Sequence, residues 1–306
     1  MLIKKLIVLC VATVLSVAAT EGVLRWLDVG DPPVFESNPR YGYLMRPSQS
    51  ASTRGRRYWI NQAGFRGADF AAVKNPGAIR VVFLGDSITY GGGQIAESDL
   101  FVNRVARMLE ATERRRVEPV NLSVPGWSLQ NMAAYVAEKG LHDADLLVWV
   151  ISAVDFRRPK ATLEENGFWE SKPVFRTVYL ASWSTRVARH LLGAGALAVA
   201  DTPSRPSETL ELNVSALDAT LRRVRSRGLP CLMVLEPADP RYGTAPTDGA
   251  RFSAVANTYG VPVADMGTVF GRHPAEKLFA DGVHLTAQGH ALVAQAITPV
   301  AQAGLR

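Results

Sequence analysis

A serine, an aspartate and a histidine occur in this chain in an order and setting that suit nucleophilic catalysis. Ser87 closes the motif Gly85-Asp86-Ser87, which directly follows the apolar run 79–84. If that run is a buried strand passing into a helix, the serine hydroxyl lies beside main-chain N–H groups that favour developing negative charge. Asp281 and His284 are three positions apart, so one short turn can present both. Together they form the minimum set for acyl transfer through a covalent ester: Ser87 as nucleophile, His284 as base and Asp281 to orient the base.

These blocks resemble those of the SGNH, or GDSL, hydrolase superfamily, whose first block reads GDS and whose last reads DxxH. The resemblance implies that the oxyanion hole combines the Ser87 N–H, a glycine N–H from a second block and an asparagine side chain from a third. The second block fits residues 121–127, which makes Gly126 the donor glycine. The Gly-x-Ser-x-Gly elbow of the α/β-hydrolases does not fit, because Thr89 stands where its second glycine would be.

The third block departs from the superfamily pattern Gly-x-Asn-Asp. Ser152 stands in place of the glycine and Val154 in place of the asparagine, and valine has no side-chain donor. Losing one oxyanion donor typically costs about 2.7–4 kcal/mol of transition-state stabilisation. Two substitutes are open: the Ser152 hydroxyl, on the same side of an extended chain as residue 154, and the indole N–H of Trp127, which is also a candidate substrate contact. We expect Val154→Asn to leave folding intact and to raise ester turnover.

Composition narrows the class of protein. A chain of 306 residues with 47% apolar content can form one domain of roughly 200–250 residues plus an appendage. The net charge is +6, but the basic residues are scattered and form no nucleic-acid-binding motif, so we expect no nucleic-acid partner. Cys10 and Cys231 lie in unlike segments and show no metal-ligand spacing. The predicted chemistry needs neither a metal nor a cofactor.

The N-terminal segment, residues 1–27, is expected to direct export. Lys4 and Lys5 precede an apolar run over residues 6–19, and residues 2–26 are long enough to span a thin bilayer. We expect a signal anchor in a bacterial inner membrane, with the catalytic domain in the periplasm. The alternative is a signal peptide that is cleaved after the small residues 17–19, giving a secreted or periplasmic protein.

The remaining chain divides into a short extension and a main domain. Residues 28–78 alternate aromatic residues with turn formers, which predicts a β-rich extension packed on the main domain, with a glycan-contacting lip as the alternative. Residues 79–306 predict a flavodoxin-like three-layer α/β/α sandwich with a parallel sheet. The expected strands are 81–84, 117–122, 146–151, 230–235 and 261–265. The expected helices are 101–109, 132–139, 214–225, 250–259 and 286–303.

This topology brings distant residues to one edge of the sheet. Because the carboxyl ends of parallel strands share an edge, Ser87, Gly126, Ser152 and His284 should gather there. An insertion at about 156–212 leaves the sheet on the same side and is a candidate lid, with a helix at 185–192 and a Pro/Ser-rich loop at 202–207. Its aromatic residues suit either packing or a sugar-stacking platform.

The function expected from these observations is that of a serine esterase. The export signal and the superfamily resemblance imply an O-acyl group, acetyl foremost, on a cell-envelope or exported carbohydrate, with lipid or thioester substrates also open. Two alternatives remain: an O-acetyltransferase that passes the acyl group to a polysaccharide from the same serine, and an inactive glycan-binding or assembly protein, which the loss of asparagine at Val154 would favour. Proteins of polysaccharide biosynthesis are the expected partners.

Overall fold

A parallel sheet forms the centre of the molecule in the computed structural model, which describes residues 1–53, 55–191, 206–237, 246–274 and 276–306. Its strands, within these residues, are β5 (Ile79–Gly85), β6 (Val117–Ser123), β7 (Leu146–Ser152), β8 (Cys231–Glu236) and β9 (Val263–Asp265). They lie in the order β6-β5-β7-β8-β9 and all neighbours are parallel. This is the flavodoxin-like strand order, so the predicted fold class is confirmed.

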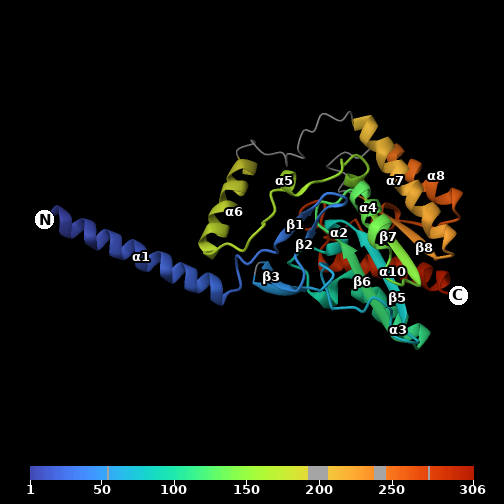
Figure 1. Cartoon of the computed structure of the whole chain (residues 1–306), viewed down its shortest axis with the longest axis horizontal. Helices are drawn as coiled ribbons and strands as arrows, with labels where there is room; N and C mark the ends of the chain where they lie inside the picture. The colour runs from blue at the N-terminus through green and yellow to red at the C-terminus, as the bar shows by residue number, and fades with distance from the viewer. Residues whose placement is uncertain (54, 192–205, 238–245, 275) are drawn as a thin grey trace.

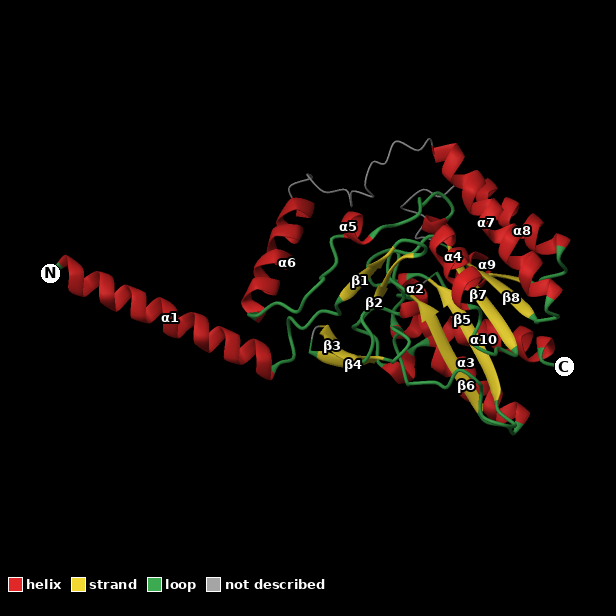
Figure 2. Cartoon of the chain, in the orientation of Figure 1, coloured by secondary structure: helices red, strands yellow, loops and turns green. Residues whose placement is uncertain are grey.

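Helices cover both faces of the sheet, as strands that are apolar on both sides require (Figure 1). The main covering helices are α3 (Phe101–Glu113), α4 (Leu129–Lys139), α7 (Pro206–Ser226), α8 (Pro246–Thr258) and α10 (Ala287–Gly304). Val81 and Phe83 of β5 share a core cluster with α3 and α10. The alternate residues Val82 and Leu84 share the other cluster with α4, α7 and α8. Figure 2 shows the resulting layers, with strands between helices.

The sheet has a topological switch point between β5 and β7. The chain leaves β5 toward β6 on one side and leaves β7 toward β8 on the other. The short helix α2 (Ser87–Tyr90) follows β5, and the 3-10 turn η2 (Ala153–Asp155) follows β7. Open α/β sheets bind ligands in the crevice at such a point, so the fold itself indicates where a site should form.

Two antiparallel hairpins precede the sheet. They are β1 (Phe35–Asn38) with β2 (Gly42–Met45), and β3 (Gln49–Thr53) with β4 (Arg56–Ile60). Phe35, Tyr43 and Met45 of the first hairpin belong to the same buried cluster as Trp127 and Tyr135 of the main domain. The β-rich extension and the α/β layers therefore share one hydrophobic core.

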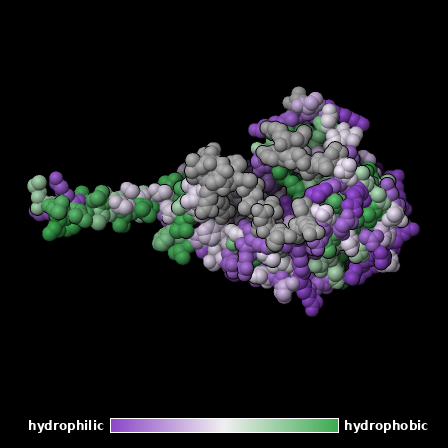
Figure 3. All heavy atoms as spheres, turned by 90° about the horizontal axis from the view of Figure 1, so that it is seen from above, coloured by the Kyte–Doolittle hydropathy of each residue, from purple (hydrophilic) through white to green (hydrophobic). Residues whose placement is uncertain are grey.

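The helix α1 (Leu2–Trp26) projects from the rest of the molecule and is mostly apolar (Figure 3). Its most apolar 18 residues have a mean hydropathy of 2.2 and none is buried. Length and composition would let this helix cross a membrane, and an N-terminal signal sequence has the same properties.

The insertion contains α5 (Leu163–Asn166) and α6 (Arg176–Leu191). The helix predicted at 185–192 is thus the second half of a longer one. Its start was missed because the cap comes from elsewhere in the chain: the Glu21 carboxylate accepts the backbone N–H groups of Arg176 and Thr177, each at 3.1 Å. Of the predicted loop at 202–207, residues 202–205 lie outside the described residues, and the last two positions begin α7.

The smaller elements are η1 (Glu97–Asp99) and α9 (Met266–Phe270).

Candidate active site

Ser87, His284 and Asp281 form a continuous chain of hydrogen bonds. His284 Nε2 lies 3.0 Å from Ser87 Oγ, and His284 Nδ1 lies 2.8 Å from Asp281 Oδ2. When Nδ1 carries the proton and donates to Asp281, Nε2 is left free to accept the proton of the serine. The structure therefore brings the three predicted residues together in the order that nucleophilic catalysis requires.

Local sequence explains how Ser87 is presented. Asp86 caps α2, because its Oδ1 accepts the Ile88 N–H at 2.9 Å. At Gly85 a Cβ atom would collide with the Thr89 side chain, so glycine is needed for β5 and α2 to approach so closely. The helix ends after one turn at Gly91, whose φ of 81° is left-handed. Ser87 thus lies on a tight turn at the carboxyl end of β5.

Asp281 shapes the loop that carries the base as well as orienting the imidazole. Its Oδ1 accepts the backbone N–H groups of His284 at 2.8 Å and Val283 at 3.2 Å, while Oδ2 faces the ring. A β-bridge between Phe279 and Leu285 closes the base of the same loop. One carboxylate therefore fixes both the backbone and the side chain of His284.

The carboxylate and the imidazole shift each other's pKa. The hydrogen bond from His284, with further help from backbone N–H groups, holds the pKa of Asp281 far below its usual 3.8, although burial opposes this. For His284, burial acts to lower the pKa, but the hydrogen bond and charge of Asp281 outweigh it and raise the pKa above the usual 6.5. The imidazolium that forms when Ser87 gives up its proton is thereby stabilised.

Gly126 occupies the position predicted for the second oxyanion donor, on the loop after β6. Its φ is 81°, which favours glycine. A Cβ atom there would lie 2.6 Å from Asn166 Oδ1 and 2.7 Å from the Tyr43 hydroxyl. Both its conformation and its surroundings therefore exclude a side chain at this position.

A model of the GDSL-like lipase/acylhydrolase family matches residues 83–292, more than half of the chain. The chain belongs to this family. It is an ester hydrolase, as the sequence motifs predict, and the matched region holds both ends of the Ser87–His284–Asp281 chain. A search of curated proteins finds no match.

Solved structures resemble the chain at low sequence identity. A lipase/acylhydrolase from Enterococcus faecalis is 18% identical, with a TM-score of 0.47 over 74% of this chain and 96% of that one. The hydrolase LAE5 from a Lake Arreo metagenome is also 18% identical, with a TM-score of 0.49 over 74% and 96% of the two chains. The acetylxylan esterase Axe2 of Geobacillus stearothermophilus is 16% identical, with a TM-score of 0.48 over 72% and 93%.

This GDSL-family chain does not place Trp127 in the site, contrary to the sequence prediction. The ring is fully buried, and its indole N–H donates to the main-chain oxygen of Tyr43 at 3.0 Å. It therefore offers no donor to an oxyanion and no surface to a substrate in this conformation. Its role in the structure is to join the second block to the N-terminal extension.

Ser152 is not available as a donor either. It is buried at the end of β7, where its hydroxyl donates to Asp155 Oδ2 at 3.0 Å and its N–H donates to the same oxygen. Val154 lies in η2 and packs against the main core cluster. Neither residue of the third block supplies what the family's asparagine would supply, so the hole needs another donor.

A buried group of charges that the sequence prediction missed lies under the switch point. Arg158 Nη1 contacts Asp155 Oδ1 at 2.8 Å and Asp86 Oδ2 at 3.2 Å, and it donates to the Trp127 carbonyl at 3.0 Å. Burial raises the pKa of Asp155, and the charge of Asp86 raises it further. The charge of Arg158 and the hydrogen bonds from Ser152 act in the opposite direction. Glu236, opposite Ser152 in the register of β7 and β8, is also buried, and burial with the charge of Asp86 raises its pKa well above the usual range. The adjacent arginines after the third block were the available sequence signal.

Arg66 holds the loop that follows the nucleophile helix. Its side chain is completely buried and donates to the carbonyls of Tyr90 at 3.0 Å, Gly92 at 2.6 Å and Ile95 at 2.6 Å. Its Nε pairs with Glu97. Arg66 lies in the segment 61–67 of the N-terminal extension, and this segment therefore supports the turn that carries Ser87.

Tyr43, on β2 of the extension, supports the second block in the same way. Its hydroxyl donates to the Pro125 carbonyl at 2.8 Å, and its own carbonyl accepts the Trp127 indole. The residues on either side of Gly126 are thus both held by one tyrosine. Tyr43 and Arg66 of the extension consequently position the two backbone turns of the site, at Gly126 and after Ser87.

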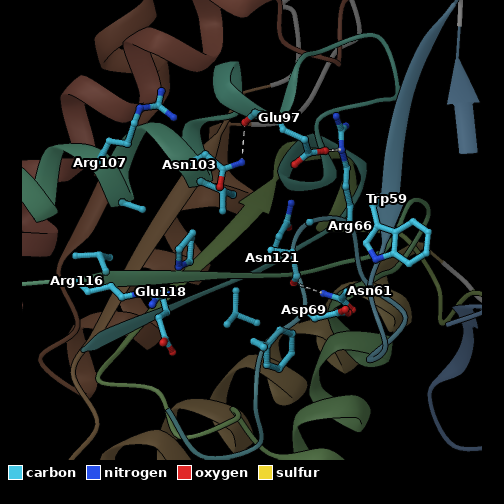
Figure 4. A pocket seen from close by; sticks show the side chains of 18 of the residues that line it. Trp59, Asn61, Arg66, Asp69, Glu97, Asn103, Arg107, Arg116, Glu118 and Asn121 are labelled. Carbon is cyan, nitrogen blue, oxygen red and sulfur yellow. Dashed lines mark hydrogen bonds and ion pairs between the residues drawn. The ribbon is translucent and has the colours of Figure 1, made fainter. Parts of the chain in front are cut away.

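A cavity of about 600 Å³ is lined by residues of the extension, α3 and β6 (Figure 4). Arg66, Glu97 and Asn121 line it, and Figure 4 shows them pointing into the same space from the extension, η1 and β6. Asn121 also donates to the Thr89 carbonyl at 3.3 Å. Ser87 and His284 are not among its lining residues, so this cavity is separate from the catalytic hydrogen bonds. In the described part of the chain, no three His, Cys, Asp or Glu side chains are grouped as metal ligands would be.

Proposed function

We propose that this ester hydrolase is a serine esterase that removes O-acyl groups, acetyl foremost, from a cell-envelope or exported carbohydrate. The observation that carries the catalytic part is the unbroken hydrogen-bonded chain from Asp281 through His284 to Ser87. Ser87, His284 and Asp281 are the proposed catalytic residues. The N–H groups of Ser87 and Gly126 are the proposed main-chain donors of the oxyanion hole.

The proposed reaction has two steps. In the first, Ser87 Oγ attacks the ester carbonyl carbon and gives its proton to His284 Nε2. The tetrahedral intermediate collapses, and the departing sugar oxygen takes that proton from His284 and leaves as a hydroxyl. In the second, His284 removes a proton from water, which attacks the acyl carbon, and then gives the proton to Ser87 Oγ as the carboxylic acid is released. Asp281 holds the imidazole in place throughout.

The exposure of the site supports a bulky substrate with a small acyl group. The side chains of Asp281 and His284 are 57% and 32% exposed, so the histidine edge of the site reaches the surface. A short ester carried on a polymer can approach such a site without the whole substrate entering a cavity. A long acyl chain would instead be expected to need an apolar channel beside the serine.

The proposed location follows from α1 and its basic start. Lys4 and Lys5 lie in the first turns of α1, which favours a start on the cytoplasmic side and a catalytic domain in the periplasm. An anchored inner-membrane protein is the preferred form, and a periplasmic or secreted protein released by cleavage is the alternative. At either location, proteins of polysaccharide biosynthesis are the proposed partners.

Labelling with a fluorophosphonate tests the nucleophile. The full-length chain in detergent should be labelled at Ser87, and Ser87→Ala should abolish labelling. Ser215→Ala, at an exposed position of α7, is the matched control and should label as the parent does. Absence of labelling in the folded parent would contradict the catalytic proposal and favour a glycan-binding protein.

Acetylated oligosaccharides test the substrate and the acceptor. Release of free acetate in proportion to loss of acetylated sugar supports hydrolysis. Appearance of acetyl on an added unacetylated oligosaccharide would instead support the O-acetyltransferase alternative. Turnover of acyl-chain esters alone, with acetylated glycans untouched, would contradict the carbohydrate assignment while leaving the serine mechanism intact.

A further inference from the structure

Arg158 lies between the two turns that carry the proposed oxyanion donors. The Trp127 carbonyl that it contacts belongs to the residue after Gly126, and the Asp86 carboxylate that it contacts belongs to the residue before Ser87. One guanidinium nitrogen therefore touches both turns, at 3.0 and 3.2 Å. A positive group that contacts both turns can stabilise negative charge that develops between them in acyl transfer.

The same loop would otherwise carry the missing asparagine. Arg158 follows Val154 by four residues and lies three residues after the end of the 3-10 turn η2. Its backbone is fixed, because the buried Asn213 side chain donates to the carbonyls of Asp155, Phe156 and Arg158. The segment that follows the third block therefore brings Arg158 to the two turns of the site.

The guanidinium keeps donors to spare. Arginine has N–H groups on three nitrogens, and the Arg158 contacts to Asp86, Asp155 and Trp127 all use Nη1. Among the described residues, Nε and Nη2 of Arg158 have no hydrogen-bond partner, and the side chain is 20% exposed. Donors on a fixed, partly exposed guanidinium are available to a ligand in the crevice.

We infer that Arg158 supplies the third oxyanion contact that Val154 cannot, with a guanidinium N–H donating to the oxygen of the tetrahedral intermediate. The inference rests on the proposed esterase function and adds a catalytic residue to it. Asp86 and Asp155 hold the guanidinium in place before the reaction, so little reorganisation is needed when the charge develops. A charge-assisted hydrogen bond replaces the neutral amide contact of the family pattern.

Asn166 is the other amide close to this place, and its contacts fit the role less well. Its Oδ1 is the atom nearest to where a Gly126 Cβ would be, and its Nδ2 donates to the Thr162 carbonyl at 2.9 Å. The side chain therefore turns its acceptor toward Gly126 and uses one of its two donors on Thr162, the N-cap residue of α5. An oxyanion needs a donor, which favours Arg158.

The test is a two-by-two set of full-length variants in detergent: parent, Arg158→Gln, Val154→Asn and the double variant. Turnover of p-nitrophenyl acetate is measured as kcat and KM separately. We expect Arg158→Gln to lower kcat by about 100-fold or more with little change in KM, the usual cost of an oxyanion donor. Val154→Asn should restore at least tenfold in the Arg158→Gln background and should raise the parent's kcat by less than that. Restoration by a new amide is not expected if Arg158 only stabilises the fold.

The neighbouring arginine provides the matched control. Arg157 pairs with Asp248 at 2.7 Å, and its side chain is 44% exposed, so Arg157→Gln should keep kcat near the parent value. If Arg158→Gln fails to fold, Asp155→Asn is added both to Arg158→Gln and to the double variant that also carries Val154→Asn. The added substitution removes the buried carboxylate that would otherwise lose its partner.

The outcomes separate this inference from the function on which it rests. A folded Arg158→Gln variant with parental kcat, or a loss that Val154→Asn leaves unrestored, overturns the role of Arg158 while the esterase stands. A parent that neither reacts with a fluorophosphonate nor turns over the ester contradicts the proposed function itself.

Discussion

Nε2 of His284 lies 3.0 Å from Oγ of Ser87, although 197 positions of sequence separate the two residues. The fold explains this proximity, since Ser87 follows β5 and the His284 loop reaches the carboxyl end of that strand. The contact makes the proton transfer from serine to histidine direct, and it sets up a pH dependence that can be measured.

Activity should rise with pH through a value above 6.5. His284 must be neutral to accept the serine proton, and Asp281 raises its pKa above 6.5 against the effect of burial. Because a raised folded-state pKa favours the charged form, the stability that His284 contributes is present below 6.5 and is lost as pH rises through the folded value. The kcat/KM profile of the parent against pH measures the acidic limb.

Asp281→Asn should move that limb to lower pH and reduce kcat. The substitution removes the charge and the acceptor that stabilise the imidazolium. In a comparable triad, the same change lowers kcat by about 10⁴-fold. The stability supplied by the depressed pKa of Asp281 is present above about pH 3.8 and is lost at lower pH. The unfolding free energy of the variant should therefore fall less than that of the parent when the pH is lowered. An unchanged limb would argue that another base operates.

Gly126→Ala should abolish most activity. The new methyl group would meet Asn166 Oδ1 and the Tyr43 hydroxyl, and the φ of 81° is unfavourable for alanine. Gly77→Ala is the matched control, since Gly77 has a φ of 78° but nothing within 4 Å of the added atom. We expect kcat to fall at least 100-fold for Gly126→Ala alone, and equal losses in both variants would show that backbone strain rather than the site is responsible.

Tyr43→Phe should lower kcat severalfold and cost about 1 kcal/mol of unfolding free energy, the typical net value of one hydrogen bond. The hydroxyl that is lost holds the Pro125 carbonyl, next to Gly126. Tyr135→Phe removes an equally buried hydroxyl that instead contacts His142 at 3.0 Å. Comparable loss of stability in both variants, with loss of kcat in the first only, would locate the effect at the second block.

Arg66→Met should destabilise the protein by about 3–5 kcal/mol, as expected when a buried charged donor is removed from its partners. The carbonyls of Tyr90, Gly92 and Ile95 lose their donor together. Chemical denaturation measures the effect, with Arg57→Met as the control at an exposed ion pair. Parental stability in Arg66→Met would show that the loop after α2 does not depend on this arginine.

The parts that could be read from the sequence are those set by local pattern. Apolar strands, amphipathic helices and the turns at Ser87 and Asp281 depend on neighbouring residues, so fold class and the geometry of the three residues were predictable. Ser152 was assigned to the wrong surroundings although its partner, Asp155, is only three positions away. Trp127 was assigned to the wrong surroundings because its partner could not be seen: the indole donates to a residue 84 positions away. Arg66 and Arg158 were missed for the same reason, since an arginine is ordinarily exposed and both are held by groups from other segments.

The support that Tyr43 and Arg66 give to the site has a practical consequence for making smaller versions of the protein. A recombinant fragment cut at residue 83, where the family match begins, would keep Ser87, Asp281 and His284 and yet lose both residues that brace the turns around them. The minimal working unit of this enzyme therefore starts upstream of Phe35, and truncation from the N-terminus should extinguish turnover well before the first residue of the triad is reached.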